Sequence, residues 1–393
     1  MKIYVVRPGD SLYAIARRNG VSVDTLVYNN QIAFPEHLAV GQTLVIPDGT
    51  SGGAMGEMEV NAYAYPSIQD DVLAEYLPYL TYLTPFTWMA DAAGGLTPPG
   101  DEALITAAYR QNVAPMMSVA NLRPAGGFSS DIAHALLTDA TAQDTLINNI
   151  VASVREHDYY GVIMDLEYVY SFDRESYNQF TKRLVGVLHP LGCLLGVALA
   201  PKIRADQEGL LYEAHDYAAQ GATADFVVLM TYEWGYLYGP PQAVSPVNQV
   251  RRVIEYAVTE MPRGKILMGF SNYGYDWTLP WRQGNAARAV TNAGAVTLAV
   301  MKRVAINFDE TAQAPFFNYT DTEGLRHVVW FEDARSVRAR LALVSEFNLR
   351  GISWCLEQKK CSENGKKPGR RSHCGAFPVF GVLLRAAYLS SRK

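Results

Sequence analysis

The chain has 393 residues, with 34 basic and 39 acidic side chains and a formal net charge of −5. This length excludes a single small domain. Hydrophobic residues make up 49% and charged residues 19%, a composition typical of a packed globular protein that excludes a wholly disordered chain. No run of about 18 apolar residues occurs, so no membrane span is predicted. The N-terminal stretch carries Arg7, Asp10 and Arg17 where an export signal needs an uninterrupted apolar run, so no signal peptide is expected.

Charge and cysteine are both unevenly distributed along the chain. Residues 359–393 hold nine basic side chains and one acidic one, a net charge of +8 that leaves −13 for residues 1–358. The acidic body argues against a nucleic-acid partner. Cys193 is the single cysteine before Cys355, which excludes an internal disulfide over most of the chain and suits synthesis in a reducing compartment.

Residues 1–47 are predicted to form a compact β-α-α-β unit. After a short strand, Asp10 or Ser11 can cap the first helix by accepting hydrogen bonds from the free N–H groups of its first turn. Ser22 can cap a second helix, and residues 41–47 return as a strand. Because a unit this short supports only a small core, we expect it to bind a ligand rather than to catalyse a reaction.

The segments VRPGDSLYAIARRNG and GQTLVIP resemble a LysM module over its whole length. This resemblance implies binding of glycans that contain N-acetylglucosamine, including peptidoglycan and chitin. The groove is expected beside the first helix and the loop after the second. The residues that match the module's glycan-binding positions are Gly9, Asp10, Ser11, Leu12 and Asn29.

The longer part of the chain alternates apolar strands with helices. Residues 48–57 have the Gly- and Ser-rich composition of a linker, and residues 58–358 contain helical patterns that include 142–156 and 174–189. Eight strands are predicted at 58–65, 80–86, 113–120, 161–167, 193–200, 225–231, 265–272 and 350–355. This pattern predicts an α/β fold, a (β/α)8 TIM barrel, in which chemistry occurs at the C-terminal ends of the strands. The interval 277–346 reads as a small α+β insertion before the last strand.

Two acidic residues lie on one face of the predicted fourth strand, 161–167. Side chains alternate along a strand, so Ile163, Asp165 and Glu167 face one way, while the residues between them are all apolar and face the helices. Two carboxyls that face a low-dielectric interior raise each other's proton affinity, which favours a general acid. The alternative is an exposed edge strand whose acids face water.

Polar and aromatic residues also end two other predicted strands, in the segments 226–234 and 269–277. All six tryptophans lie in this domain, most of them just after a predicted strand. A tryptophan taken alone is more often a core residue, but flat apolar rings with a polar group also suit the faces of sugars. We therefore predict a sugar-binding cleft, with candidate contacts Trp88, Glu233, Trp234, Asn272, Tyr273, Asp276, Trp277 and Trp354.

The segments YYGVIMDLEYV, LMTYEWGYLYG and SNYGYDWTLPW resemble glycoside hydrolase family 18, and within it the bacterial spore branch of YaaH/SleL-like cortex-lytic N-acetylglucosaminidases. The family signature on the fourth strand is Asp-x-x-Asp-x-Asp-x-Glu. Asp165 and Glu167 match its end, whereas Ile163 and Tyr160 occupy the two earlier Asp positions.

The resemblance implies substrate-assisted, retaining hydrolysis. In that scheme Glu167 protonates the leaving oxygen, and the substrate's own acetamido carbonyl attacks the anomeric carbon. Asp165 orients the acetamido N–H, and Tyr232 donates a hydrogen bond to the acetamido carbonyl. No metal or other cofactor is required.

Two further roles follow from the resemblance. The family has a Trp at the end of the last strand that forms the floor of the cleavage subsite. That Trp aligns here with either Trp354 or Cys355. Glu233 stands where many members have Asp, and it either contacts sugar or acts on Asp165.

The resemblance stops after Trp354. Residues 359–393 form a basic tail of unknown role, which we expect to be non-homologous, as after a reading-frame change, and to leave the eighth helix poorly formed. Cys361, His373 and Cys374 lack the paired spacing of a zinc site.

These observations predict a peptidoglycan-binding glycosidase that cleaves N-acetylglucosaminyl bonds in spore cortex peptidoglycan or its fragments during germination. A non-catalytic wall-binding coat protein and a chitinase or endo-N-acetylglucosaminidase are the alternatives. The expected partner is peptidoglycan or another glycan containing N-acetylglucosamine, and the chain is expected to be a monomer. It would be made in the mother-cell cytoplasm and deposited in the spore coat or cortex.

Overall fold

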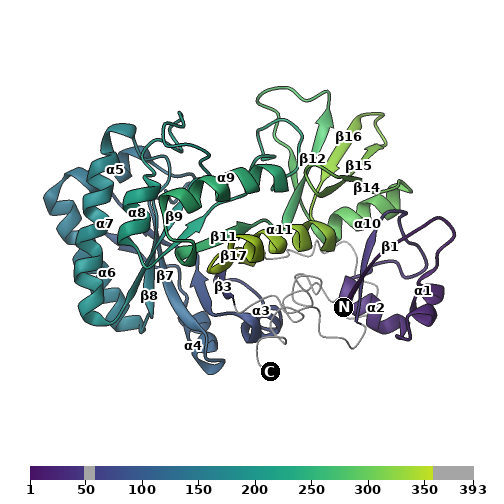
Figure 1. Cartoon of the computed structure of the whole chain (residues 1–393), viewed down its shortest axis with the longest axis horizontal. Coiled ribbons are helices and arrows are strands. Elements are labelled where there is room, and N and C mark those ends of the chain that lie inside the picture. Colours follow the sequence, from purple (N-terminus) through teal and green to yellow (C-terminus); the bar gives the residue numbers. More distant parts are fainter. Residues whose placement is uncertain (48–57, 357–393) are drawn as a thin grey trace.

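The computed structural model describes residues 1–47 and 58–356. A small N-terminal unit lies at one end of the molecule, a barrel lies at the other, and a second sheet stands beside the barrel (Figure 1). The predicted linker 48–57 and tail 359–393 lie outside the described residues, as does the expectation about the eighth helix.

The N-terminal unit has the predicted β-α-α-β order. It consists of β1 (Lys2–Val5), α1 (Leu12–Arg18), α2 (Val23–Asn30) and β2 (Thr43–Ile46), and the two strands are antiparallel. Of the two capping candidates, Ser11 caps α1, because its hydroxyl accepts from the N–H of Ala14. The carboxylate of Asp10 instead accepts from the N–H of Arg7 and from the hydroxyl of Tyr4.

The eight predicted strands form a closed parallel barrel. They are β3 (Glu59–Ala64), β4 (Tyr82–Pro85), β7 (Ala114–Ala120), β8 (Gly161–Asp165), β9 (Leu194–Leu199), β10 (Phe226–Leu229), β11 (Ile266–Phe270) and β17 (Gly351–Leu356). Neighbouring strands pair in the order β4-β3-β17-β11-β10-β9-β8-β7, and β7 pairs back with β4 to close the ring. A short hairpin of β5 (Trp88–Ala90) and β6 (Leu96–Thr97) continues from β7.

Helices surround the barrel (Figure 1). They are α3 (Asp70–Tyr76), α4 (Glu102–Arg110), α5 (Ser130–Thr138), α6 (Ala140–His157), α7 (Arg174–Leu188), α8 (Tyr217–Thr223), α9 (Val247–Glu260) and α11 (Ala334–Phe347). The predicted helices 142–156 and 174–189 correspond to α6 and α7. Among the described residues, no helix has both the length and the apolar character needed to cross a membrane.

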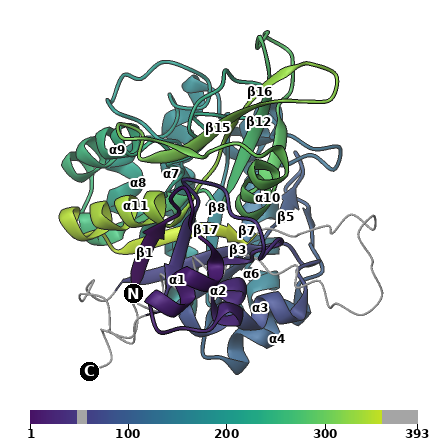
Figure 2. The same ribbon diagram turned by 90° about the vertical axis from the view of Figure 1, so that its right-hand side faces the viewer.

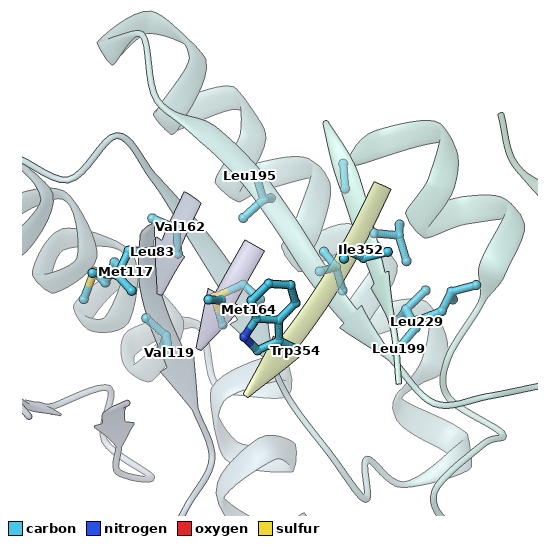
Figure 3. Packing of buried hydrophobic residues seen from close by; sticks show 14 of the residues in the cluster. Leu83, Met117, Val119, Val162, Met164, Leu195, Leu199, Leu229, Ile352 and Trp354 are labelled. Atoms are coloured by element: carbon cyan, nitrogen blue, oxygen red, sulfur yellow. The ribbon is translucent and has the colours of Figure 1, made fainter. Parts of the chain in front are cut away.

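The barrel has two hydrophobic layers. The outer layer packs between strands and helices and includes Val162 and Met164 of β8 (Figure 3). The inner layer fills the barrel and includes Ile163, Tyr63 and Phe226. The alternation predicted for the fourth strand is therefore confirmed, because β8 sends its residues by turns into these two layers.

The predicted insertion is a five-stranded antiparallel sheet with one helix. Its elements are β12 (Tyr273–Leu279), β13 (Arg288–Thr291), α10 (Asn292–Lys302), β14 (Asn307–Asp309), β15 (Ala314–Thr320) and β16 (Arg326–Trp330), with strand order β13-β12-β16-β15-β14. The expected bounds, 277–346, differ from the observed ones at both ends. The sheet begins at Tyr273, and α11 belongs to the barrel because Val337, Leu341 and Val344 pack in the outer layer.

The N-terminal unit is docked against the insertion and the barrel (Figure 2). The N–H of Ile306 donates to the carbonyl of Val40 at 2.8 Å, and the Arg335 guanidinium donates to the carbonyl of Gly41 at 3.3 Å. Gly41 has φ +85°, and a Cβ there would lie 1.9 Å from the Ile306 oxygen. Only glycine fits this contact.

Candidate active site

Asp165 and Glu167 lie at the C-terminal mouth of the barrel. Asp165 is the last residue of β8, and its side chain is buried, with 5% of the residue exposed. Glu167 follows two residues later and is partly buried. Leu166, between them, packs in the outer layer, so the two acids share the inward direction that the alternation predicts.

Burial raises the pKa of both acids, and the charge of Asp165 acts further on Glu167. Burial raises the pKa of Asp165 to about 7. Burial, then the charge of Asp165 and then that of Glu233, raise the pKa of Glu167 well above its usual range. Glu167 therefore carries a proton near neutral pH, as a general acid must.

Asp165 also has an open acceptor position. Its Oδ1 is buried and has no hydrogen-bond partner among the described residues. A buried carboxyl oxygen without a partner costs free energy, so a donor that enters the mouth would be bound favourably there.

Tyr232 lies close to both acids. Burial raises the pKa of its phenol well above the usual range, and Cys355, Asp165 and Glu167 raise it further. The phenol consequently stays protonated and can donate a hydrogen bond into the mouth. The structure thus brings together the three residues predicted to be catalytic.

Two buried side chains that the sequence analysis missed hold the backbone of this segment. Asn121, which follows β7, accepts from the N–H of Glu167 at 3.0 Å and donates to its carbonyl at 2.9 Å. A third bond runs from Asn121 to the carbonyl of Ser129. Asn121 directly follows the predicted strand 113–120, so its position at a strand end was an available signal.

His215 holds the neighbouring peptide group. Its Nδ1 accepts from the N–H of Ala200 at 2.8 Å, so the proton is on Nε2, which donates to the carbonyl of Leu166 at 3.0 Å. Burial lowers the pKa of His215 to about 4, so the ring is neutral. No signal in the sequence pointed to this residue.

Glu233 and Asn272 occupy other parts of the mouth. The Glu233 carboxylate accepts hydrogen bonds from the hydroxyls of Tyr273 and Tyr275, and burial raises its pKa against their effect. The Asn272 amide donates to the carbonyl of Cys355 at 2.5 Å, which joins the segment between β11 and β12 to β17. Sugar contacts by Glu233, Asn272, Tyr273 and the half-buried Trp234 stay predictions.

Several predicted sugar contacts are wrong, because the side chains are buried elsewhere. The Asp276 carboxylate lies within the insertion, where it binds Arg288, Tyr319 and His327. Trp277 is 1% exposed and donates to the carbonyl of Gly239.

Trp88 is likewise a core residue. It is buried in the outer layer, and its indole N–H donates to the hydroxyl of Tyr159. In the N-terminal unit, the side chain of Leu12 is also buried, in the unit's own core. Glycan contacts at Gly9, Asp10, Ser11 and Asn29 stay predictions.

The end of β17 resolves the choice between Trp354 and Cys355. Trp354 is buried in the outer layer, and its ring lies 6.3 Å from that of Tyr76 (Figure 3). Trp354 therefore cannot floor the mouth. Cys355 packs against the inner layer and lies close enough to Tyr63 and Tyr232 to raise the pKa of both phenols. A thiol thus occupies the inward position.

A protonated carboxyl that lies near a second carboxyl and a phenol donor can act as the general acid of a glycosidase built on a barrel. No group of three or more His, Cys, Asp or Glu side chains within residues 1–47 and 58–356 could hold a metal ion.

The chain belongs to glycosyl hydrolases family 18, whose sequence profile matches residues 105–357. Residues 4–47 match the LysM domain.

The similar proteins include spore enzymes. The cortical fragment-lytic enzyme of Bacillus subtilis (strain 168) is 42% identical over 90% of this chain and 94% of its own length, and that of Bacillus anthracis is 41% identical with the same coverage. The crystal structure of the Bacillus megaterium QM B1551 spore cortex-lytic enzyme SleL has a TM-score of 0.87 at 33% identity, and the match covers 98% of this chain and 97% of that one.

Proposed function

We propose that this protein is a glycosidase that cleaves N-acetylglucosaminyl bonds in fragments of spore cortex peptidoglycan. The observation that carries the proposal is the acid pair, in which burial and the charge of Asp165 keep Glu167 protonated. The relatives' name, cortical fragment-lytic enzyme, supports the substrate class. The LysM domain supports binding to peptidoglycan.

The geometry supports substrate-assisted hydrolysis, in which no second carboxylate acts as the nucleophile. Glu167 gives its proton to the glycosidic oxygen while the substrate's acetamido carbonyl oxygen attacks the anomeric carbon, and the C–O bond to the leaving sugar breaks. The product is an oxazolinium ion. Glu167, now a carboxylate, then takes a proton from the water that opens this ring.

Two groups hold the acetamido group in this scheme. The open Oδ1 of Asp165 accepts from the acetamido N–H and stabilises the positive charge that develops. The Tyr232 phenol donates to the acetamido oxygen and so aims it at the anomeric carbon. A substrate without an N-acetyl group on the sugar before the cleaved bond would therefore not react.

The test compares wild-type protein with Glu167→Gln on purified cortex fragments, with the muropeptides identified by mass spectrometry. Glu346→Gln, which changes an exposed carboxylate paired with Arg251, is the matched control. We expect cleavage products from the wild type and the control, and none from Glu167→Gln. Equal products from all three would exclude Glu167 as the acid. Tight binding to wall without products from the wild type would favour a non-catalytic coat protein, and cleavage of chitin oligosaccharides alone would favour a chitinase.

A further inference from the structure

Large apolar side chains are exposed around the mouth of the barrel. Those on loops that follow barrel strands are Tyr65, Tyr168, Phe172, Leu210, Tyr236 and Tyr238. Phe172 is 72% exposed, more than any other large hydrophobic side chain among the described residues. Single exposed apolar residues need no explanation, but a group on one functional face indicates a binding surface.

Four aromatic rings lie beside β8 in two pairs, which we together call the β8 aromatic strip: Phe128 with Tyr168, and Tyr170 with Phe172. The rings of Tyr170 and Phe172 are stacked, with centroids 5.0 Å apart and an angle of 18° between their planes. Those of Phe128 and Tyr168 are 6.5 Å apart. The strip runs from the residue next to Glu167 out to the start of α7.

The strip is held in a fixed shape by contacts with α5. The Tyr170 hydroxyl donates to the carboxylate of Asp131 at 2.8 Å, and the hydroxyl of Ser130 donates to the carbonyl of Tyr168 at 2.6 Å. The His134 ring lies edge-on to Tyr170 and Phe172, at 6.1 and 5.7 Å.

A hydrogen bond to an aspartate holds that histidine in turn. Its Nδ1 lies 2.8 Å from the carboxylate of Asp173, which is buried. The histidine that contacts Phe172 is therefore itself held in place, while most of Phe172 stays exposed. Rings that are ordered before a ligand arrives lose little entropy on binding it.

The strip continues into the catalytic mouth. Tyr168 follows Glu167 in the chain, and burial, then the charge of Glu167, raise the pKa of its phenol. A ligand chain that leaves the acid pair on this side would therefore pass over Tyr168 before it reaches the stacked pair.

We propose that the β8 aromatic strip is a platform for sugar rings beyond the cleaved bond, so that the protein favours glycan strands over disaccharide-sized fragments. This inference rests on the proposed function and extends it to substrate length. The C–H faces of pyranose rings pack on aromatic planes, and the sugar hydroxyls remain free for water. Rigid aromatic rings give a large contact area at low entropic cost.

The binding test needs no turnover. In a Glu167→Gln background, the affinity for a hexamer of N-acetylglucosamine is measured by calorimetry with and without Phe172→Ala, and the dimer serves as a short probe. We expect Phe172→Ala to weaken hexamer binding about tenfold, which corresponds to about 1.4 kcal/mol, and to weaken dimer binding far less. Phe172→Trp keeps a ring and should restore hexamer affinity.

The control is Tyr160→Ala, which removes a tyrosine of 46% exposure just before β8, at the opposite end of the barrel. Unchanged hexamer affinity in Phe172→Ala would overturn the proposal, as would an equal loss for hexamer and dimer. In turnover, the ratio of hexamer to dimer kcat/KM should fall about tenfold in Phe172→Ala. If the wild type cleaves nothing, the proposed function fails, while the calorimetric comparison still decides the role of the strip.

Discussion

Removing the charge of Asp165 should shift the pH dependence of activity to lower pH. The anion of Asp165 raises the pKa of Glu167, so in Asp165→Asn that pKa falls and Glu167 loses its proton at lower pH. Because the general acid must be protonated, the alkaline limb of the pH profile moves in the acid direction. Asp165 titrates near pH 7, so its effect is fully developed only above that value.

The magnitude follows from the strand geometry. Glu167 lies two residues beyond Asp165, the last residue of β8, and an extended backbone separates residues two apart by roughly 6.6 Å. At an effective dielectric constant of about 20, two unit charges at this distance repel by about 2.5 kcal/mol. Such an energy would displace the alkaline limb by at most about 1.8 pH units, because solvent at the mouth screens the pair. We therefore expect the limb to move by about 1 to 2 pH units.

The assay is the initial rate of hydrolysis against pH, on a substrate whose leaving group is a sugar and therefore needs protonation. Asp165→Asn will turn over slowly, so the position of the limb is compared and not its height. Glu233→Gln should move the limb in the same direction by less, because Glu233 is the weaker of the two charges acting on Glu167. An alkaline limb that stays in place, or moves to higher pH, would refute the assignment of that limb to Glu167.

Three further predictions concern the supports of the site and the docking of the N-terminal unit. Asn121→Ala should lower kcat more than it raises KM and cost about 1 to 3 kcal/mol of unfolding free energy, since it leaves buried backbone groups unpaired; an unchanged kcat would contradict this. The pKa of His215 is lowered to about 4 in the folded protein, so between about pH 6.5 and 4 the unfolded chain binds a proton that the folded chain does not. The free energy of unfolding should therefore decrease by about 3 kcal/mol as pH falls through this range. Urea unfolding of His215→Gln should lack that component, whereas parallel pH curves would argue against it. Gly41→Ala should lower the midpoint of thermal unfolding more than Gly9→Ala does. Both glycines have φ near +84°, but only at Gly41 would a Cβ lie against a carbonyl oxygen. Equal decreases would show that the docking contact is weak.

Much of the barrel was predictable because its signals are local. Each strand is a short apolar run between helical patterns, and all eight lie where those runs occur. The inward direction of Asp165 and Glu167 follows from the alternation along one strand, which needs no knowledge of the neighbours. The caps of α1 and α2 are equally local, since a serine hydroxyl binds an N–H three residues away.

The tryptophans show where such reasoning fails. Trp88, Trp277 and Trp354 all lie in or beside strands, yet each is buried outside the mouth. Nearness to a strand end does not reveal which face a side chain takes or what covers it. For Trp354, a shift of one residue along β17 separates the outer layer from the inner one.

The sequence by itself determined the barrel, the N-terminal unit and the acid pair, because these depend on patterns within a few residues. Only the tertiary structure decided what holds the acids in place. Asn121 and His215 reach Glu167 and Leu166 across separations of 46 and 49 residues, through the pairing of neighbouring parallel strands. Such contacts depend on strand register and on where each loop ends, and the local pattern of residues predicts neither of these.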